Sequence, residues 1–110
     1  MLSLLATTLL LPQGVDFARD VQPILTANCF ACHGPDAGAR KGKLRLDTHA
    51  GAIASVIVPG KSRESELMRR ITAKDADDRM PPVKSGKTLT TAQIKTLSRW
   101  IDQGATWERH

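Results

Sequence analysis

The chain has 110 residues, enough for one domain and too few for two, and its 41% apolar and 25% charged residues exclude collagen, low-complexity disorder and a polytopic membrane protein. Aromatic residues make up only 4%, so the core is marginal unless a disulfide, a metal or a cofactor is buried with it. The net charge of +5 favours an acidic partner, but the basic residues form no dense run and there are few aromatic rings to stack on bases, which argues against nucleic acid.

The chain begins with an apolar stretch over residues 2–11, closed by Pro12 and Gly14. It is too short to span a bilayer as a helix and has the length of a signal-peptide core, although it lacks a basic start and a clear cleavage site. An apolar first helix of the domain is the competing interpretation. We favour the remnant of an export signal over residues 1–14. This predicts a periplasmic or cell-envelope location, a single domain over residues 15–110, and no stable transmembrane span in the mature chain.

The first predicted element is a helix that ends near Cys29, because apolar residues recur at helical spacing from Phe17. Since Pro23 fits only the first turn of a helix, the regular part begins near Asp20 or bends there. A glycine-rich, charged loop over residues 34–43 follows. Two short apolar runs come next, residues 44–46 and residues 56–58. They are compatible with a two-stranded ribbon, with a small turn of helix over residues 48–55 between them.

Two more helices are predicted in the second half of the chain. Ser62 is expected to cap a helix that runs to Thr72, and Thr90 with Gln93 forms a capping box for a helix that ends at Gly104. The polar loop between them, residues 73–89, is long enough to imply a function. The predicted fold class is therefore all-α, with about three helices and long loops, and with the ribbon as an option.

One motif carries the chemistry. Cys29-Phe30-Ala31-Cys32-His33 is C-x-x-C-H, the attachment signature of c-type haem. Two thiols form thioethers with the two vinyl groups, and two intervening residues place both sulfurs at the same edge of the porphyrin. The adjoining His33 is then the proximal ligand of the iron. We therefore expect one covalent haem c with its iron.

Other uses of two cysteines fit less well. A thioredoxin-like redox pair needs a strand before its helix, and a zinc site needs a fourth ligand and usually a second pair of donors. A disulfide between Cys29 and Cys32 would close too small a loop to stabilise much.

The sixth position on the iron has several candidate ligands. Met68 belongs to an apolar helical stripe, where a methionine that fills the core is the simpler interpretation. Met80 is different, because it lies among charges and prolines, 47 residues after His33, with no helical face to join. We predict Met80 as the distal ligand, with His49 as its rival; His110 is a further histidine of the chain.

Longer stretches of the sequence, over residues 15–107, resemble the planctomycete-type cytochrome c domain. The motifs that carry the resemblance are Phe17-x-x-Asp20-Val21-x-Pro23-Ile24-Leu25, Cys29-x-x-Cys32-His33-Gly34, Leu44-Arg45-Leu46-Asp47, Val58-Pro59-Gly60, Ser65-x-Leu67, Arg79-Met80-Pro81-Pro82, Leu89-Thr90-x-x-Gln93-Ile94 and Trp100-Ile101-x-x-Gly104-Ala105. The resemblance implies a class-I-like cytochrome fold with covalent haem at Cys29 and Cys32, and with His33 proximal and Met80 distal. Such domains usually form the N-terminal part of long exported proteins, which continue where this chain reaches His110, so the chain is a fragment or a free-standing relative.

These observations favour an electron carrier over an enzyme, because an iron with both axial positions filled leaves no place for a substrate. The competing hypotheses are an electron-relay module of a larger exported oxidoreductase, and a five-coordinate haem sensor or peroxidase in which Met80 does not bind. The partner is a redox protein, and its expected acidic surface would meet Arg40, Lys41, Lys43, Lys84 and Lys87. The apolar residues expected to pack against the haem are Phe17, Ile24, Leu25, Leu67, Ile71, Leu97 and Trp100.

Overall fold

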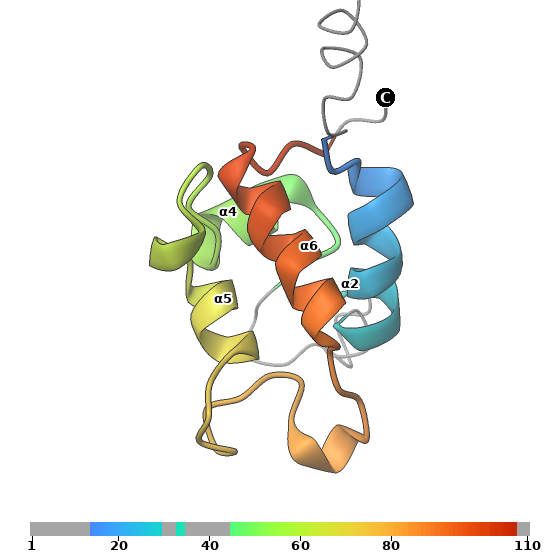
Figure 1. Cartoon of the computed structure of the whole chain (residues 1–110), viewed down its shortest axis with the longest axis vertical. Coiled ribbons are helices and arrows are strands. Elements are labelled where there is room, and N and C mark those ends of the chain that lie inside the picture. The colour runs from blue at the N-terminus through green and yellow to red at the C-terminus, as the bar shows by residue number, and fades with distance from the viewer. Residues whose placement is uncertain (1–13, 30–32, 35–44, 108–110) are drawn as a thin grey trace, which may run out of the picture.

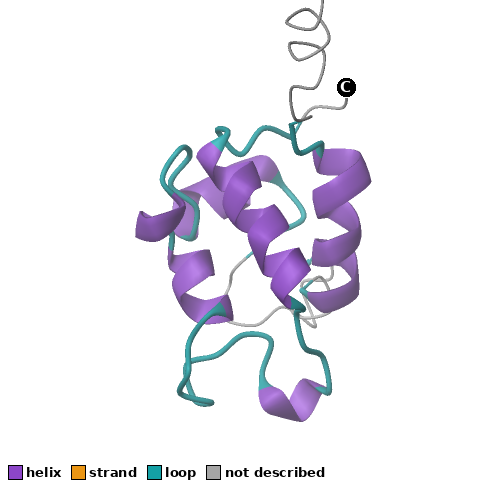
Figure 2. Ribbon diagram, viewed as in Figure 1, coloured by secondary structure: helices purple, strands orange, loops and turns teal. Residues whose placement is uncertain are grey.

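A computed structural model describes residues 14–29, 33–34 and 45–107 of the chain. The predicted export signal, apart from Gly14, lies outside this part, as do Cys32 and His110. Helices and loops make up the described residues, which contain no strand, so the all-α prediction is confirmed (Figure 2). None of the helices found there has the length and apolar character needed to cross a bilayer. The elements in chain order are η1 (Phe17–Val21), α2 (Gln22–Asn28), α4 (His49–Ser55), η2 (Ser62–Glu64), α5 (Glu66–Ile71), η3 (Val83–Ser85) and α6 (Thr91–Asp102).

Helix α6 is the centre of the domain. It passes between α2 and α5, and it contacts η1, η2 and α5 (Figure 1). Its apolar stripe of Leu97, Trp100 and Ile101 is almost fully buried, which matches the predicted face, and Ile94 at its first turns is half-buried.

The first helix begins earlier than predicted. A π-helical turn, η1, starts at Phe17 after an N-cap at Asp16, whose carboxylate accepts a hydrogen bond from the Arg19 N–H at 2.8 Å. The chain changes to α-helix at Gln22, directly before Pro23, which has no N–H to donate. The irregularity expected at the proline therefore takes the form of a wider turn before it.

The two-stranded ribbon does not form among the described residues. The Leu46 N–H donates to the His33 carbonyl at 2.7 Å, and the Val56 carbonyl accepts from the Leu67 N–H at 3.0 Å. Each run thus pairs its backbone with another segment instead of with the other run. The helix predicted between them is present as α4.

Ser62 does not cap the second predicted helix, which is split in two at Ser65. Ser65 has extended backbone, and its hydroxyl accepts from the Val58 N–H at 2.9 Å and donates to the Lys61 carbonyl at 3.0 Å. The Ser62 N–H donates to Asp102 at the end of α6. Both serines are buried, and these tertiary bonds produce a short 3-10 turn, η2, before α5 starts at Glu66.

The capping box of α6 is confirmed, since the side chains of Thr90 and Gln93 each bond to the other's backbone N–H. After α6 the chain turns at Gly104 and Ala105, whose φ values of 112° and 53° are left-handed. This turn lets the Thr106 carbonyl accept from Trp100 Nε1 at 2.8 Å and brings the Trp107 ring to 4.1 Å from that of Phe17.

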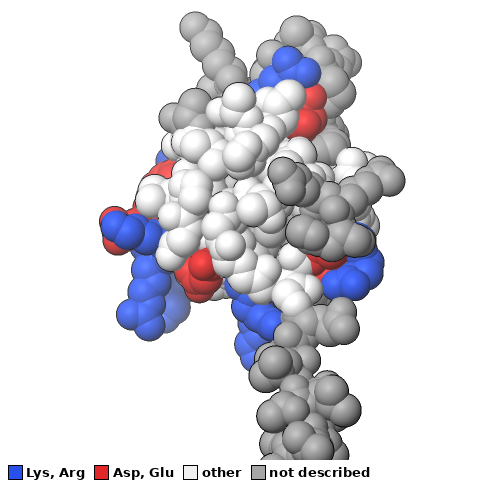
Figure 3. Space-filling view, turned by 90° about the horizontal axis from the view of Figure 1, so that it is seen from above, with Lys and Arg blue, Asp and Glu red and all other residues white. Residues whose placement is uncertain are grey.

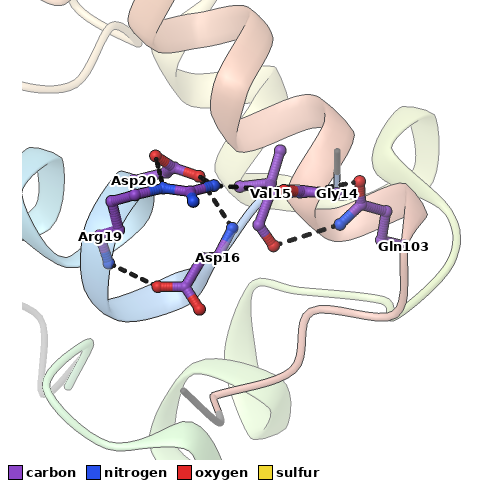
Figure 4. Close-up of polar contacts among 6 residues, drawn as sticks. All are labelled: Gly14, Val15, Asp16, Arg19, Asp20 and Gln103. Atoms are coloured by element: carbon purple, nitrogen blue, oxygen red, sulfur yellow. Dashed lines mark hydrogen bonds and ion pairs between the residues drawn. The ribbon is translucent and has the colours of Figure 1, made fainter. Parts of the chain in front are cut away.

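The start of the described chain is fastened to the end of α6. The Gln103 side-chain amide accepts from the Val15 N–H at 3.1 Å and donates to the Val15 carbonyl at 3.3 Å, as Figure 4 shows. The face of the molecule seen from above this end has an uncharged centre, with both basic and acidic side chains towards its edges (Figure 3).

Candidate haem site

A cleft lies at the end of the domain opposite the Val15–Gln103 contact. It is partly open to solvent, and the space between its walls, open solvent included, is about 680 Å³. The residues that line it are Asn28, Cys29, His33, Leu46, Val56, Leu67, Arg70, Ile71, Met80, Pro81, Pro82, Ser85 and Lys87.

Cys29 reaches the cleft directly after the end of α2. The Cys29 N–H donates to the Leu25 carbonyl and the His33 N–H donates to the Cys29 carbonyl, both at 2.8 Å, so each makes a bond with the four-residue spacing of an α-helix. The His33 carbonyl in turn accepts from Leu46. The backbone of His33 is therefore held from both sides, and both Cys29 and His33 line the cleft.

The imidazole of His33 has an unusual environment. Its Nδ1 is the one buried side-chain nitrogen or oxygen in the described part of the chain that has no hydrogen-bond partner. Buried polar atoms are nearly always paired, so this nitrogen is an exception among the described residues. A histidine that lines the same apolar cleft as Cys29 fits the donor set of a c-type haem, in which one ring nitrogen binds the iron and the other donates to a hydrogen-bond acceptor.

Met80 approaches the cleft from the loop that follows α5. Its N–H donates to the Arg70 carbonyl at 3.1 Å, and it is half-buried beside Pro81, which is buried. The structure thus brings three of the predicted site residues, Cys29, His33 and Met80, to one cleft.

The rival ligands lie elsewhere. Met68 is half-buried and packs against the core without lining the cleft, in agreement with the core interpretation. His49 is exposed at the start of α4, and its ring centre is 5.2 Å from that of Trp107, among the aromatic rings at the other end of the domain.

The predicted haem-packing residues divide into two groups. Leu67 and Ile71 of α5 line the cleft as expected. The other five are buried in the core and do not line it; they are Phe17, Ile24, Leu25, Leu97 and Trp100. Contact of these five residues with haem therefore stays a prediction, because apolar periodicity identifies a buried face and does not say whether protein or cofactor covers it. Sequence reasoning missed Leu46, Val56, Pro81 and Pro82 as lining residues, although three of them belong to short motifs noted above.

Positive charge accompanies the apolar lining. Arg70 and Lys87 are the charged side chains that line the cleft in the part of the chain that the structure describes. Arg70 is held by Glu66, whose carboxylate accepts from Arg69 and, at 3.0 Å, from Arg70 Nε. Hydrogen bonds from Arg69 first, and then from Arg70, lower the pKa of Glu66 from 4.5 to about 2.

A helical domain whose C-x-x-C-H segment opens onto an apolar cleft has the features of a c-type cytochrome. The family model described as Planctomycete cytochrome C matches residues 29–84, half of the chain, and the chain belongs to that family. This membership places it among haem-binding cytochromes and confirms the resemblance inferred from the motifs.

A second comparison finds an enzyme subunit. The chain is 24% identical to the hydrazine synthase subunit alpha of Kuenenia stuttgartiensis, in an alignment that covers 86% of this chain and 16% of that protein. The chain therefore spans about one sixth of the length of this relative. No solved structure matches the chain significantly.

Proposed function

We propose that this chain is a single-haem c-type cytochrome domain that transfers one electron at a time. Cys29 and Cys32 attach the haem, His33 is the proximal ligand and Met80 is the distal ligand. One observation carries the proposal: Met80, 47 residues after His33, lines the same cleft as Cys29 and His33.

Each residue has a role that follows from its surroundings. The backbone hydrogen bonds of His33 hold its main chain beside the cleft, and its Nδ1 makes no hydrogen bond within the described protein. Leu46, Leu67 and Ile71 are buried and give the cleft apolar walls. Haem held there supplies a one-electron iron couple, and a thioether as the second axial ligand favours the ferrous state.

Attachment is the first test. Protein expressed with a haem-attachment system should keep its haem through acid–organic extraction and show the added mass of one haem. Replacing Cys29 and Cys32 with Ala should abolish both results. Haem that extracts freely from the native sequence would refute covalent attachment.

A second candidate function is an electron relay within a larger oxidoreductase. It is favoured by the likeness to one sixth of an enzyme subunit. The genomic reading frame beyond His110 separates the two: an in-frame extension supports the relay, and a stop codon at that point supports the free carrier. In both cases we propose that residues 15–110 are the domain that carries the electron and that no substrate binds the iron.

Export and an acidic redox partner belong to the same proposal. The apolar stretch over residues 2–11 has the length of a signal-peptide core. Lys87 lines the cleft, and Lys84 lies three residues earlier, next to the exposed Val83. Electron-transfer rates with an acidic partner should fall steeply as salt rises, and the double variant K84Q/K87Q should flatten that dependence. An electron-transfer rate that does not change between low and physiological ionic strength would show that these lysines are solvated surface residues that do not attract the partner.

A further inference from the structure

The loop that carries Met80 has few ties to the rest of the described protein, and several of them converge on Arg70. The backbone carbonyl of Arg70, in the last turn of α5, accepts from the Met80 N–H at 3.1 Å. The guanidinium Nη1 of the same residue donates to the Asp78 carbonyl at 3.3 Å and lies 3.7 Å from the Asp78 carboxylate. One residue of α5 thus holds the loop by its main chain and by its side chain.

The side chain of Arg70 is itself oriented from α5. Its Nε donates to Glu66, one turn earlier, while Nη1 reaches Asp78 in the loop. The planar guanidinium can make both bonds at once because its donors point in fixed directions. Arg70 also lines the cleft, and its side chain is 36% exposed, compared with 55% for its neighbour Arg69.

We propose that Arg70 is a positioning residue for the distal ligand: it fixes the segment from Asp78 to Met80 on the end of α5 and so holds Met80 at the cleft. This inference rests on the proposed function, in which Met80 binds the iron. Without the side-chain bridge, the loop should open more often, and Met80 should leave its place more often.

Arg69 provides a matched control. It donates two hydrogen bonds to the same Glu66 carboxylate, at 2.8 and 2.6 Å, and bonds to no side chain or carbonyl of the loop among the described residues. Arg69→Gln and Arg70→Gln therefore both remove a positive charge and a bond to Glu66. The bridge to Asp78 is lost in Arg70→Gln alone.

The experiment measures how readily free imidazole displaces Met80 in the ferric, haem-loaded protein. The apparent affinity of such a competitor scales with the fraction of molecules in which the ligand has left. We expect Arg70→Gln to raise the imidazole affinity roughly three- to tenfold, the effect of losing a partly exposed, charge-assisted hydrogen bond. Arg69→Gln should leave it unchanged. Arg70→Lys keeps the charge without the planar fork, so it should recover only part of the difference.

Hydrogen exchange of the Met80 amide gives a readout that does not need the iron. It should accelerate by a similar factor in Arg70→Gln and stay at the wild-type rate in Arg69→Gln.

Equal behaviour of the two variants in both assays, or full recovery by Arg70→Lys, would overturn the proposal. A changed reduction potential with an unchanged Met80 amide would also overturn it, because Arg70 would then act on the haem carboxylates. A wild-type protein without thioether ligation would refute the proposed ligand set instead, and the amide exchange would still decide whether Arg70 holds the loop.

Discussion

The two ends of the domain are stabilised in different ways. At one end, Trp100, Phe17 and Trp107 pack against one another with ring centres 4.1 to 5.7 Å apart, and Gln103 fastens Val15 to α6. At the other end, apolar side chains face a cleft, a histidine nitrogen has no partner, and a loop is held largely through Arg70. The first end is stabilised by contacts within the protein, whereas at the second end apolar side chains line a cleft. Three of the four aromatic residues of the chain, Phe17, Trp100 and Trp107, lie at the first end.

The largest effect is expected at the aromatic end. Trp100 is 1% exposed, and its indole N–H is bonded to the Thr106 carbonyl. Trp100→Ala should lower the free energy of unfolding by about 3–5 kcal/mol, with or without haem, because the cavity and the lost bond are both internal to the protein. Denaturant unfolding of the two forms measures this. A loss confined to the haem-loaded form would contradict the division into two ends.

At the cleft end, the corresponding change is Met80→Ala. It should lower the reduction potential, since a soft thioether favours ferrous iron, and should allow carbon monoxide to bind readily. The stability loss should appear in the haem-loaded protein and be small without haem. Potentiometry and carbon monoxide titration check the first two effects. Met68→Leu, a volume-conserving change in the core, should alter none of them.

A smaller effect is expected where α4 joins the segment that lines the cleft. A Cβ at Gly51 would lie 2.6 Å from the Arg45 carbonyl oxygen and 2.9 Å from Thr48 Oγ1. Gly51→Ala should therefore cost about 1–3 kcal/mol of unfolding free energy and loosen the bond from Leu46 to His33. Thermal unfolding measures the cost. The control is Ala50→Ser, a change at the exposed residue next to Gly51. Equal stability of the two variants would show that the segment adjusts freely.

Acid should weaken both ends through one carboxylate each. Arg19 hydrogen bonds, followed by the Asp16 N–H, lower the pKa of Asp20 from 3.8 to about 2, and the pKa of Glu66 is lowered to a similar value. Because each folded-state pKa lies below the ordinary value, the stabilisation is complete above the ordinary pKa and is lost as pH falls towards 2. Urea unfolding over this range should show a shallower acid loss in Asp20→Asn and in Glu66→Gln than in the wild type. Identical pH profiles would show that these exposed pairs contribute nothing.

The smallest effect is expected from the side chain that ties Val15 to α6. Gln103→Ala removes two exposed hydrogen bonds, so unfolding should become easier by about 0.5–1.5 kcal/mol. Gln22→Ala removes an exposed glutamine that makes no such bond and should be neutral. Chemical denaturation compares the two, and the carbon monoxide response should match the wild type in both.

Features governed by neighbouring residues were predictable from the sequence. The capping box at Thr90, the stop at Gly104 and the buried stripe of α6 depend on contacts within one turn or on helical period, and each is present. The family motif Trp100-Ile101-x-x-Gly104-Ala105 has a physical explanation here, since two buried side chains precede two left-handed residues that turn the chain back.

Features governed by distant residues were not predictable. The break at Ser65 depends on bonds to Val58 and Lys61. Among the described residues the ribbon does not form, because Leu46 and Val56 bond to other segments. The candidate site falls between these cases. C-x-x-C-H is local and specific, whereas the lining by Leu46 and Val56, and the role of Arg70, depend on how α5 and the following loop come together.

The absorption spectrum of the ferric, haem-loaded protein tests the central claim most directly, because it reports whether a thioether from the Met80 loop completes the site that His33 begins. We expect a long-wavelength thioether–iron band in the wild type that persists in Met68→Leu and disappears in Met80→Ala. High-spin ferric iron in the wild type, or a band lost in Met68→Leu and kept in Met80→Ala, would contradict the account.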